Sequence, residues 1–128
     1  MVIGIGIDIV NIERIERMIV RYGDRFLDRI FTKSEKEYCS GKIMKYESFA
    51  ARFSAKEAAL KAIGTGWRYG IRFADIEVTH DPLGKPEINV YGKAKEWVES
   101  ELVSKIHVSL SHLSEMATAV VVIEKKGD

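Results

Sequence analysis

The sequence contains very little of several residue types that define other classes of protein. Its 128 residues include one cysteine and two prolines, and the formal net charge is only +1. The single cysteine, Cys39, permits no disulfide within the chain and no cysteine-rich zinc site. A net charge near zero gives no general attraction to nucleic acid. Any electrostatic recognition must therefore come from a local cluster of charges.

Long apolar runs are also missing. A membrane-spanning helix needs about 20 predominantly apolar residues in a row, and the chain has no such stretch. The first residues lack the basic region followed by an apolar run that is typical of a secretory signal. With the single cysteine, these absences lead us to expect a cytoplasmic protein that binds neither membrane nor nucleic acid.

What remains is an ordinary globular composition, with 46% hydrophobic and 30% charged residues. It suits a single domain over residues 1–128, because no repeat, low-complexity tract or linker divides the chain. Gly4 and Gly6 lack the third glycine of a dinucleotide-binding motif, since Ile9 stands in its place. A later Gly-Thr-Gly segment lacks the Lys-Ser/Thr ending of a phosphate loop.

The spacing of apolar residues predicts both helices and strands. The predicted helices run from the N-cap Asn11 to Gly23, from the capping box of Thr32 and Glu35, from Tyr46 to Ile63, and from Lys93 to Leu102. The predicted strands are Val2–Ile9, Asp75–Thr79, Glu87–Tyr91, Lys105–Ser111 and Met116–Ile123, with a turn at Asp81–Pro86. This order favours an α+β fold with a largely antiparallel sheet packed against one long central helix and shorter helices.

Two acidic side chains stand where a carboxylate is unusual. Asp8 ends an otherwise apolar strand, and Glu57 lies at the edge of the apolar face of the long helix, one turn before Lys61. Spacing alone favours a structural role for each. Asp8 would cap a helix or pair with an arginine, and Glu57 and Lys61 would form a simple pair on one helix. The alternative is a site for Mg²⁺, which takes one or two carboxylates plus phosphates and water.

Alternation in the segment Lys105–Ser111 places His107, Ser109 and Ser111 on one face of a strand. Such a face is commonly just solvated, and a phosphate-binding face is the alternative. No Ser-His-Asp triad or metal-binding histidine pair is convincing, because His107 and His112 face different ways in a regular strand.

Arginine is concentrated in the first helix and directly after it. The five residues are Arg14, Arg17, Arg21, Arg25 and Arg29, and no lysine occurs before Lys33. A basic stripe is usually a solvated face, and Glu13 and Glu16 dilute this one. Arginine also suits bidentate recognition of carboxylates, so docking of an acidic protein is the alternative.

Four segments, in order and at compatible spacing, resemble motifs of the bacterial holo-acyl-carrier-protein synthases, the short trimeric type of 4′-phosphopantetheinyl transferase. They are Gly4–Val10, Arg52–Ala62 with the following Gly64–Gly66, Gly84–Pro86, and His107–His112. The similarity runs from about Ile3 to Glu124, nearly the whole chain. Each segment alone is modest, and the four together are specific to the family.

The resemblance implies a transferase that moves the 4′-phosphopantetheine arm of coenzyme A to a serine of apo acyl carrier protein in fatty acid biosynthesis. The serine hydroxyl attacks the β-phosphorus, and 3′,5′-ADP leaves. A non-catalytic module that binds coenzyme A or a nucleotide is the alternative. A scaffold protein that uses the arginine-bearing helix is a further rival, which leaves Asp8 and Glu57 unexplained.

The resemblance also implies a role for each matching residue. Asp8 and Glu57 hold Mg²⁺, and Lys61 contacts the pyrophosphate of coenzyme A. Arg52 and His107 lie near the 3′-phosphate, and Gly84, Lys85, Pro86 and Ser109 lie near the adenine and ribose. Arg14, Arg17, Arg21 and Arg25 dock the acidic helix of the carrier protein. The implied assembly is a homotrimer with active sites in clefts between subunits.

Overall fold

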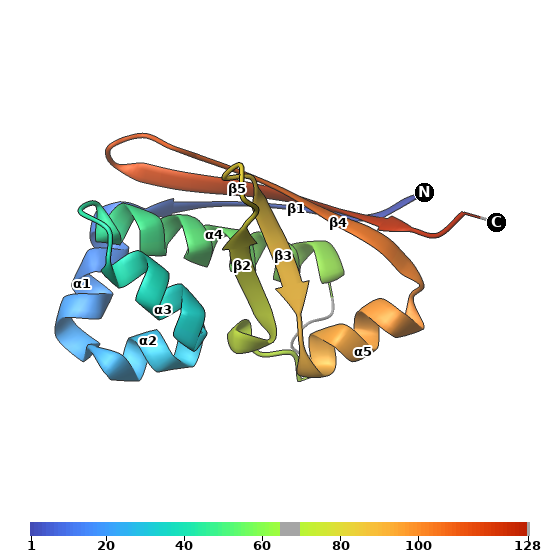
Figure 1. The fold of residues 1–128 in the computed structure, drawn as a ribbon, viewed down its shortest axis with the longest axis horizontal. Helices are drawn as coiled ribbons and strands as arrows, with labels where there is room; N and C mark the ends of the chain where they lie inside the picture. The colour runs from blue at the N-terminus through green and yellow to red at the C-terminus, as the bar shows by residue number, and fades with distance from the viewer. Residues whose placement is uncertain (65–69, 128) are drawn as a thin grey trace.

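A long three-stranded sheet lies across one long helix in the computed structural model of the chain (Figure 1). The structure describes residues 1–64 and 70–127. In chain order the elements are β1 (Val2–Asn11), α1 (Ile12–Tyr22), α2 (Asp24–Ile30), α3 (Lys33–Ser40), α4 (Lys45–Ile63), η1 (Phe73–Asp75), β2 (Ile76–His80), β3 (Pro86–Val90), α5 (Gly92–Ser100), β4 (Val103–His112) and β5 (Met116–Lys125). Thr65 and Gly66, part of the second family segment, lie outside the described residues.

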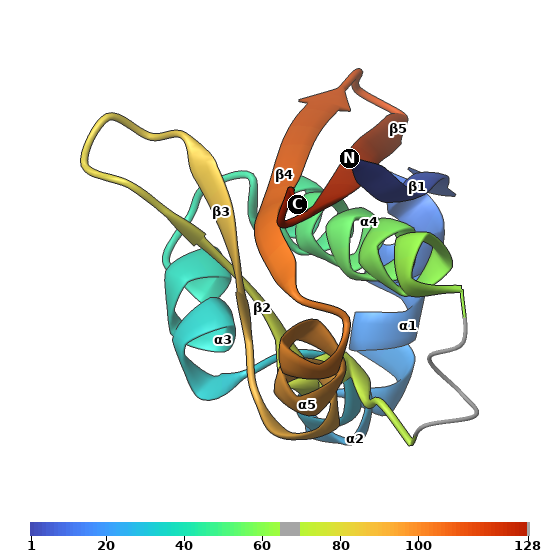
Figure 2. The same ribbon diagram turned by 90° about the vertical axis from the view of Figure 1, so that its right-hand side faces the viewer.

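The strands form two antiparallel sheets. The larger sheet has the order β1-β5-β4, and β2 pairs only with β3 in a separate hairpin within the described part of the chain. Figure 2 shows α4 beneath the larger sheet, with the hairpin beside β4 and α5 below it. The predicted α+β class with antiparallel strands around a long central helix is confirmed, although the strands are divided between two sheets.

Most predicted elements are confirmed within a few residues, including the cap at Asn11 and the capping box at Thr32. The helix α2 was not predicted, because Gly23 indicates a helix end and the seven residues that follow are too few for a clear period. Gly23 turns the chain at φ 55°, and its carbonyl then accepts the amides that begin α2. Asp75 lies in η1 rather than in the predicted strand, because its carboxylate accepts the amide of Arg72.

Two glycines allow α4 to pack directly on β1. Gly4 and Gly6 lie on the sheet face that carries the buried residues of β5 and that α4 covers. A Cβ atom at Gly6 would lie 1.9 Å from the carbonyl oxygen of Ala58, and one at Gly4 would lie 2.2 Å from that of Ala62. Only glycine permits this approach of strand and helix backbones. Because Asp8 is next on the same face, the contact also brings its carboxylate to α4.

A buried ion pair anchors the other side of α4. The Nζ of Lys56 lies 2.6 Å from Oε1 of Glu35, and both side chains are fully buried. Burial lowers the pKa of Lys56, and the charge of Glu35 opposes that shift. The Lys56 ammonium also donates to the carbonyl oxygens of Ile30, Phe73 and Ile76. Glu35 accepts the amides of Thr32 and Val78, so the pair joins α4 to α2, α3, η1 and β2.

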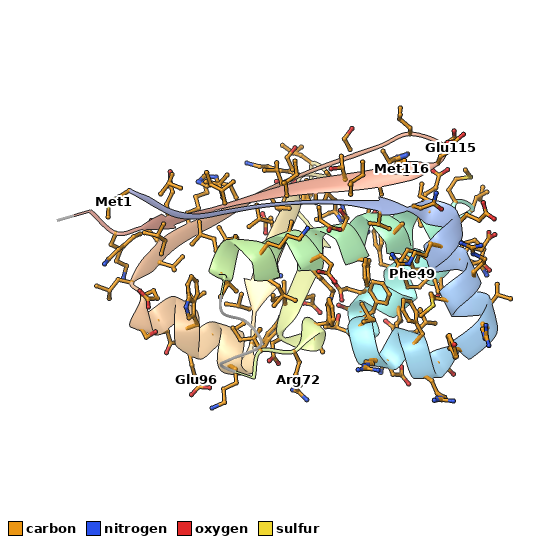
Figure 3. All side chains as sticks on the ribbon, turned by 180° about the vertical axis from the view of Figure 1, so that it is seen from behind. Met1, Phe49, Arg72, Glu96, Glu115 and Met116 are labelled. Atoms are coloured by element: carbon orange, nitrogen blue, oxygen red, sulfur yellow. The ribbon has the colours of Figure 1, made fainter. Side chains whose placement is uncertain are left out.

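Buried apolar residues form two clusters along α4, which is buried more completely than the predicted stripe of Phe49, Phe53, Leu60 and Ile63 suggests. Figure 3 labels Phe49 in the cluster that joins α4 to α1, α2 and α3. It also places Glu115 at the end of the sheet above α1, where the Glu115 carbonyl accepts the first amide of that helix. Among the described residues, no helix is both long and apolar enough to cross a membrane.

The close approach of β1 and α4 predicts that Gly6→Ala destabilises the protein. The added methyl group overlaps the α4 backbone, so the helix must move off the strand, at a cost of about 3 kcal/mol of unfolding free energy. Urea denaturation measures the change. Gly41→Ala is the control, because a Cβ there meets its nearest neighbour at 3.6 Å, and it should stay within about 0.5 kcal/mol of the wild type. Equal stability of Gly6→Ala and the wild type would show that the approach is looser than described.

Candidate active site

Asp8, Glu57 and Lys61 meet in one hollow between the end of β1 and the middle of α4. The hollow has a volume of about 340 Å³. Its other lining residues come from β1, α1, α2 and α4 and are Ile9, Val10, Asn11, Arg14, Ile15, Met18, Phe26 and Phe53. The structure therefore brings together the two carboxylates and the lysine that the sequence singles out.

Asp8 is fixed through both its carboxylate and its main chain. The carboxylate is 14% exposed, and the ammonium of Lys61 lies 3.0 Å from its Oδ1. Lys61 also donates to the carbonyl oxygen of Ile7 at 3.1 Å. The carbonyl oxygen of Asp8 accepts the hydroxyls of Ser54 at 3.0 Å and Thr118 at 2.7 Å. These contacts hold the residue between β5 and α4.

Glu57 is partly buried beside Asp8. Burial raises the pKa of Glu57, and the nearby charge of Asp8 raises it further. Lys61 and Arg14 act in the opposite direction, so both cations lie close enough to affect the site. A half-buried pair of like charges is a place where an added cation is stabilising.

The donor set fits Mg²⁺. Across residues 1–64 and 70–127, no three or more His, Cys, Asp or Glu side chains gather to hold a metal ion by themselves. Two carboxylates that face one hollow are instead the set that Mg²⁺ uses when waters and substrate phosphates complete its shell. Lys61 and Arg14 are the cationic side chains that line the same hollow.

Two of the four arginines that the sequence singles out line hollows, and the other two are exposed on α1. Arg14 lines the hollow of Asp8 and Glu57. Arg25 lines a second hollow of about 250 Å³ between α1 and α2. Met18 and Phe26 line both, so the two hollows adjoin. Arg17 and Arg21 are exposed on α1.

A third hollow, of about 390 Å³, lies between the β2–β3 hairpin and β4. It is lined by Lys85, Pro86 and His107, three residues of the later family segments. Gly84 precedes them in the hairpin turn at φ 88°, a conformation that favours glycine. Ser109 is exposed two residues along β4, on the same face as His107, as alternation predicts.

Arg52 lies in a separate hollow of about 670 Å³, called the Arg52 hollow below. Its lining includes Tyr38, Lys42, Glu47, Ser48, His80 and His112. Arg52 is only 3% exposed, yet it borders this open space. None of the residues that line the hollow of Lys85 and His107 lines this one, so Arg52 and His107 border different hollows of the chain.

Sequence reasoning missed several residues that shape these hollows. Met18 belongs to the predicted first helix and Phe26 to the unpredicted α2, and only the turn at Gly23 places both between two hollows. Tyr38 and His80 are distant in the chain and belong to no segment that resembles the family. A histidine directly before the hairpin turn is the one signal that was present, and alone it is weak.

Known proteins resemble this chain over nearly its whole length. A family model described as the 4′-phosphopantetheinyl transferase superfamily matches residues 4–121. The holo-[acyl-carrier-protein] synthase of Koribacter versatilis is 48% identical over 124 residues, which cover 97% of this chain and 99% of that protein.

Solved structures of similar proteins share the fold. The crystal structure of the holo-[acyl-carrier-protein] synthase from Neisseria meningitidis matches with a TM-score of 0.90 and 38% identity, over 98% of this chain and 100% of that one. The Helicobacter pylori synthase, solved in complex with coenzyme A, matches with a TM-score of 0.82 and 36% identity, over 94% and 99% of the two chains. The chain therefore belongs to the 4′-phosphopantetheinyl transferase superfamily.

Proposed function

We propose that the chain is a holo-[acyl-carrier-protein] synthase, which transfers 4′-phosphopantetheine from coenzyme A to a serine of apo acyl carrier protein. The observation that carries the proposal is the meeting of Asp8, Glu57 and Lys61 in one hollow of a chain from this superfamily. The relatives named above are synthases of this kind, and one was solved with coenzyme A. No observation favours a non-catalytic binding module. A cytoplasmic location remains a prediction.

Transfer at a phosphorus centre depends mainly on positioning and on neutralising charge. The serine oxygen of the carrier bonds to the β-phosphorus of coenzyme A while the bond to 3′,5′-ADP breaks. Asp8 and Glu57 would hold Mg²⁺, which when bound neutralises charge on the diphosphate. Lys61 is about half exposed, so its ammonium can turn from Asp8 to a phosphate oxygen. Arg14 adds a further positive charge at the rim.

The arginines of α1 and α2 suit an acidic helix. Arg17 and Arg21 lie along α1, while Met18, Tyr22 and Phe26 offer an apolar floor beside Arg25. Charges at the rim with apolar residues between them are the usual composition of a protein-binding surface. Since this surface adjoins the hollow of Asp8, a carrier protein docked here can present its serine to the site.

The outer face of the larger sheet suits contact with further copies of the chain. Ile5, Ile7 and Ile9 are 66%, 65% and 63% exposed in a row along β1. The β5 residues opposite the first two are Val122 and Val120. An exposed apolar strip of this kind marks an interface. We therefore propose that it packs in the homotrimer that the resemblance implies.

The hollows give a second reason for an assembly. Asp8 lies on the inner face of β1, at one edge of the larger sheet, and His107 lies on the outer face of β4, at the other edge. The larger sheet therefore separates these two residues within one chain. A neighbouring subunit can present its own Gly84, Lys85, Pro86, His107 and Ser109 to the nucleotide.

The direct experiment is a mass measurement. Purified chain, coenzyme A, Mg²⁺ and apo acyl carrier protein are incubated, and the intact carrier is weighed. One added phosphopantetheine per carrier supports the proposal. An unmodified carrier, despite binding of coenzyme A by the chain, would instead indicate a binding module.

The two carboxylates should be required separately. Asp8→Asn and Glu57→Gln each remove a charge with little change of shape, so we expect a loss of transfer of about 100-fold or more with the fold retained. Direct binding of Mn²⁺, followed by electron paramagnetic resonance, should weaken in parallel. Glu99→Gln, an exposed carboxylate on α5, is the control. Normal transfer and unchanged metal dependence in both variants would refute the metal assignment.

Reversing the arginine charges of α1 and α2 should weaken binding of the carrier protein without affecting coenzyme A. In Arg21→Glu/Arg25→Glu we expect the KM for acyl carrier protein to rise about tenfold and its salt dependence to weaken, because rim charges guide association. The KM for coenzyme A should stay the same. Lys93→Glu/Lys95→Glu on α5 is the matched control. An equal rise of both KM values in the arginine variant would rule out a docking role.

A charge in the isoleucine strip should break the assembly. Ile7→Lys is tolerated by the isolated fold because the side chain is exposed, so we expect a folded monomer that no longer transfers phosphopantetheine. Light scattering after size exclusion measures the mass. Val20→Lys, at an exposed apolar position on α1, should leave the trimer intact. An active wild-type monomer would contradict the shared active site.

A further inference from the structure

The buried guanidinium of Arg52 is oriented by two hydrogen bonds. Its Nη1 donates to the hydroxyl of Ser48 at 3.3 Å, and its Nη2 lies 3.0 Å from Nδ1 of His80. Within the described residues, Nε of Arg52 is the buried side-chain nitrogen that has no hydrogen-bond partner. The side chain therefore depends on few contacts, and the one to His80 is the shorter.

The chemistry of the pair fixes the state of His80. A guanidinium has only donors and does not lose its proton in proteins, so Nδ1 of His80 must accept. An accepting Nδ1 carries no proton, which makes the ring neutral with its proton on Nε2. Burial lowers the pKa of His80, and the charges of Arg52 and Lys42 lower it further, against a smaller opposing effect of Asp81.

Tyr38 holds both partners in place. Its ring stacks on that of His80 with centroids 5.3 Å apart and an interplanar angle of 15°. The Cζ of Arg52 lies 4.1 Å from the same ring centroid, and Nζ of Lys42 lies 4.5 Å from it. Cations over an aromatic face are attracted to it. The other titratable residues of the hollow, Glu47 and His112, approach each other to 3.7 Å.

These contacts place two cations beside the hollow, one buried and one exposed, where an anion can bind. Lys42 is exposed and contacts only the Tyr38 ring among the aromatic residues that the structure describes, whereas Arg52 is held in a single direction by Ser48, His80 and Tyr38. A rigid guanidinium suits a phosphate monoester, which accepts two parallel hydrogen bonds.

We propose that His80 is a positioning residue, whose neutral ring orients Arg52 toward the 3′-phosphate of coenzyme A and thereby sets the preference for coenzyme A over dephospho-coenzyme A. The inference rests on the proposed function, which supplies coenzyme A as the ligand of Arg52. Dephospho-coenzyme A carries the same diphosphate and pantetheine and lacks only the 3′-phosphate, so it isolates this contact.

Two variants separate the acceptor from the ring. His80→Phe keeps a flat ring against Tyr38 and removes the acceptor. His80→Asn removes the ring and keeps an oxygen near the position of Nδ1. We expect His80→Phe to raise the KM for coenzyme A about tenfold, the effect of one charge-assisted hydrogen bond, with kcat and the KM for dephospho-coenzyme A within twofold of the wild type. His80→Asn should stay within about threefold of the wild type with both substrates.

Arg52→Ala distinguishes failure of this inference from failure of the proposed function. If Arg52→Ala abolishes the preference for coenzyme A and His80→Phe retains it, His80 does not position the arginine. If Arg52→Ala raises the KM of both substrates equally, Arg52 does not bind the 3′-phosphate, and the inference fails with that assignment. If His80→Asn behaves like His80→Phe, the ring and not the acceptor is what matters, and the inference is again wrong.

Nuclear magnetic resonance of the wild type tests the inference without any variant. The ¹⁵N shifts of His80 at pH 7 should show an unprotonated Nδ1 and a protonated Nε2. A proton on Nδ1 would overturn the proposed contact even if His80→Phe fails to fold. The preference for coenzyme A should also fall only at a pH below the ordinary histidine value of about 6.5, because the neutral ring is the form that accepts.

Discussion

The contact between the backbones of β1 and α4 is the constraint on which the rest of the structure depends. Because Gly4 and Gly6 have no side chain, the strand backbone lies directly against the helix backbone at Ala58 and Ala62. The same approach brings Asp8 within reach of Lys61 and beside Glu57. Packing of the core and assembly of the site are thus linked, because Asp8 meets Lys61 and Glu57 only when the strand lies on the helix.

Much of the fold and part of the site follow from the sequence. The apolar strand that Asp8 ends and the position of Glu57 on its helix mark both carboxylates as unusual, but spacing alone does not show that they meet. The two glycines read as half of a nucleotide-binding motif, and their use in packing is clear only once α4 is placed against β1. The pair of His80 and Arg52 could not be predicted, because their contact depends on where a hairpin ends relative to a helix 28 residues away.

The charged side chains of the molecule are gathered into local groups that the net charge does not reveal. A net charge of +1 hides a hollow with two carboxylates and two cations, an arginine-bearing surface that adjoins it, and an anion site around Arg52. Each group is local, so each can attract a different ligand: a hard cation, an acidic protein and a phosphate. The opposite faces of the larger sheet keep the carboxylates apart from His107, which is why we propose that a neighbouring subunit completes the site.

The neighbours Lys56 and Glu57 point to different sides of the same helix. Lys56 is fully buried, where it contacts Glu35 and three carbonyl oxygens, while Glu57 faces the hollow that Asp8 lines. A survey of random variants scored by bacterial growth would find both positions intolerant and would give them the same weight. The loss at Lys56 would reflect a protein degraded before it works, whereas the loss at Glu57 would reflect a stable but inactive one. Two adjacent residues of one family segment would therefore be needed for different reasons, one for the fold and the other, in the function we propose, for the metal.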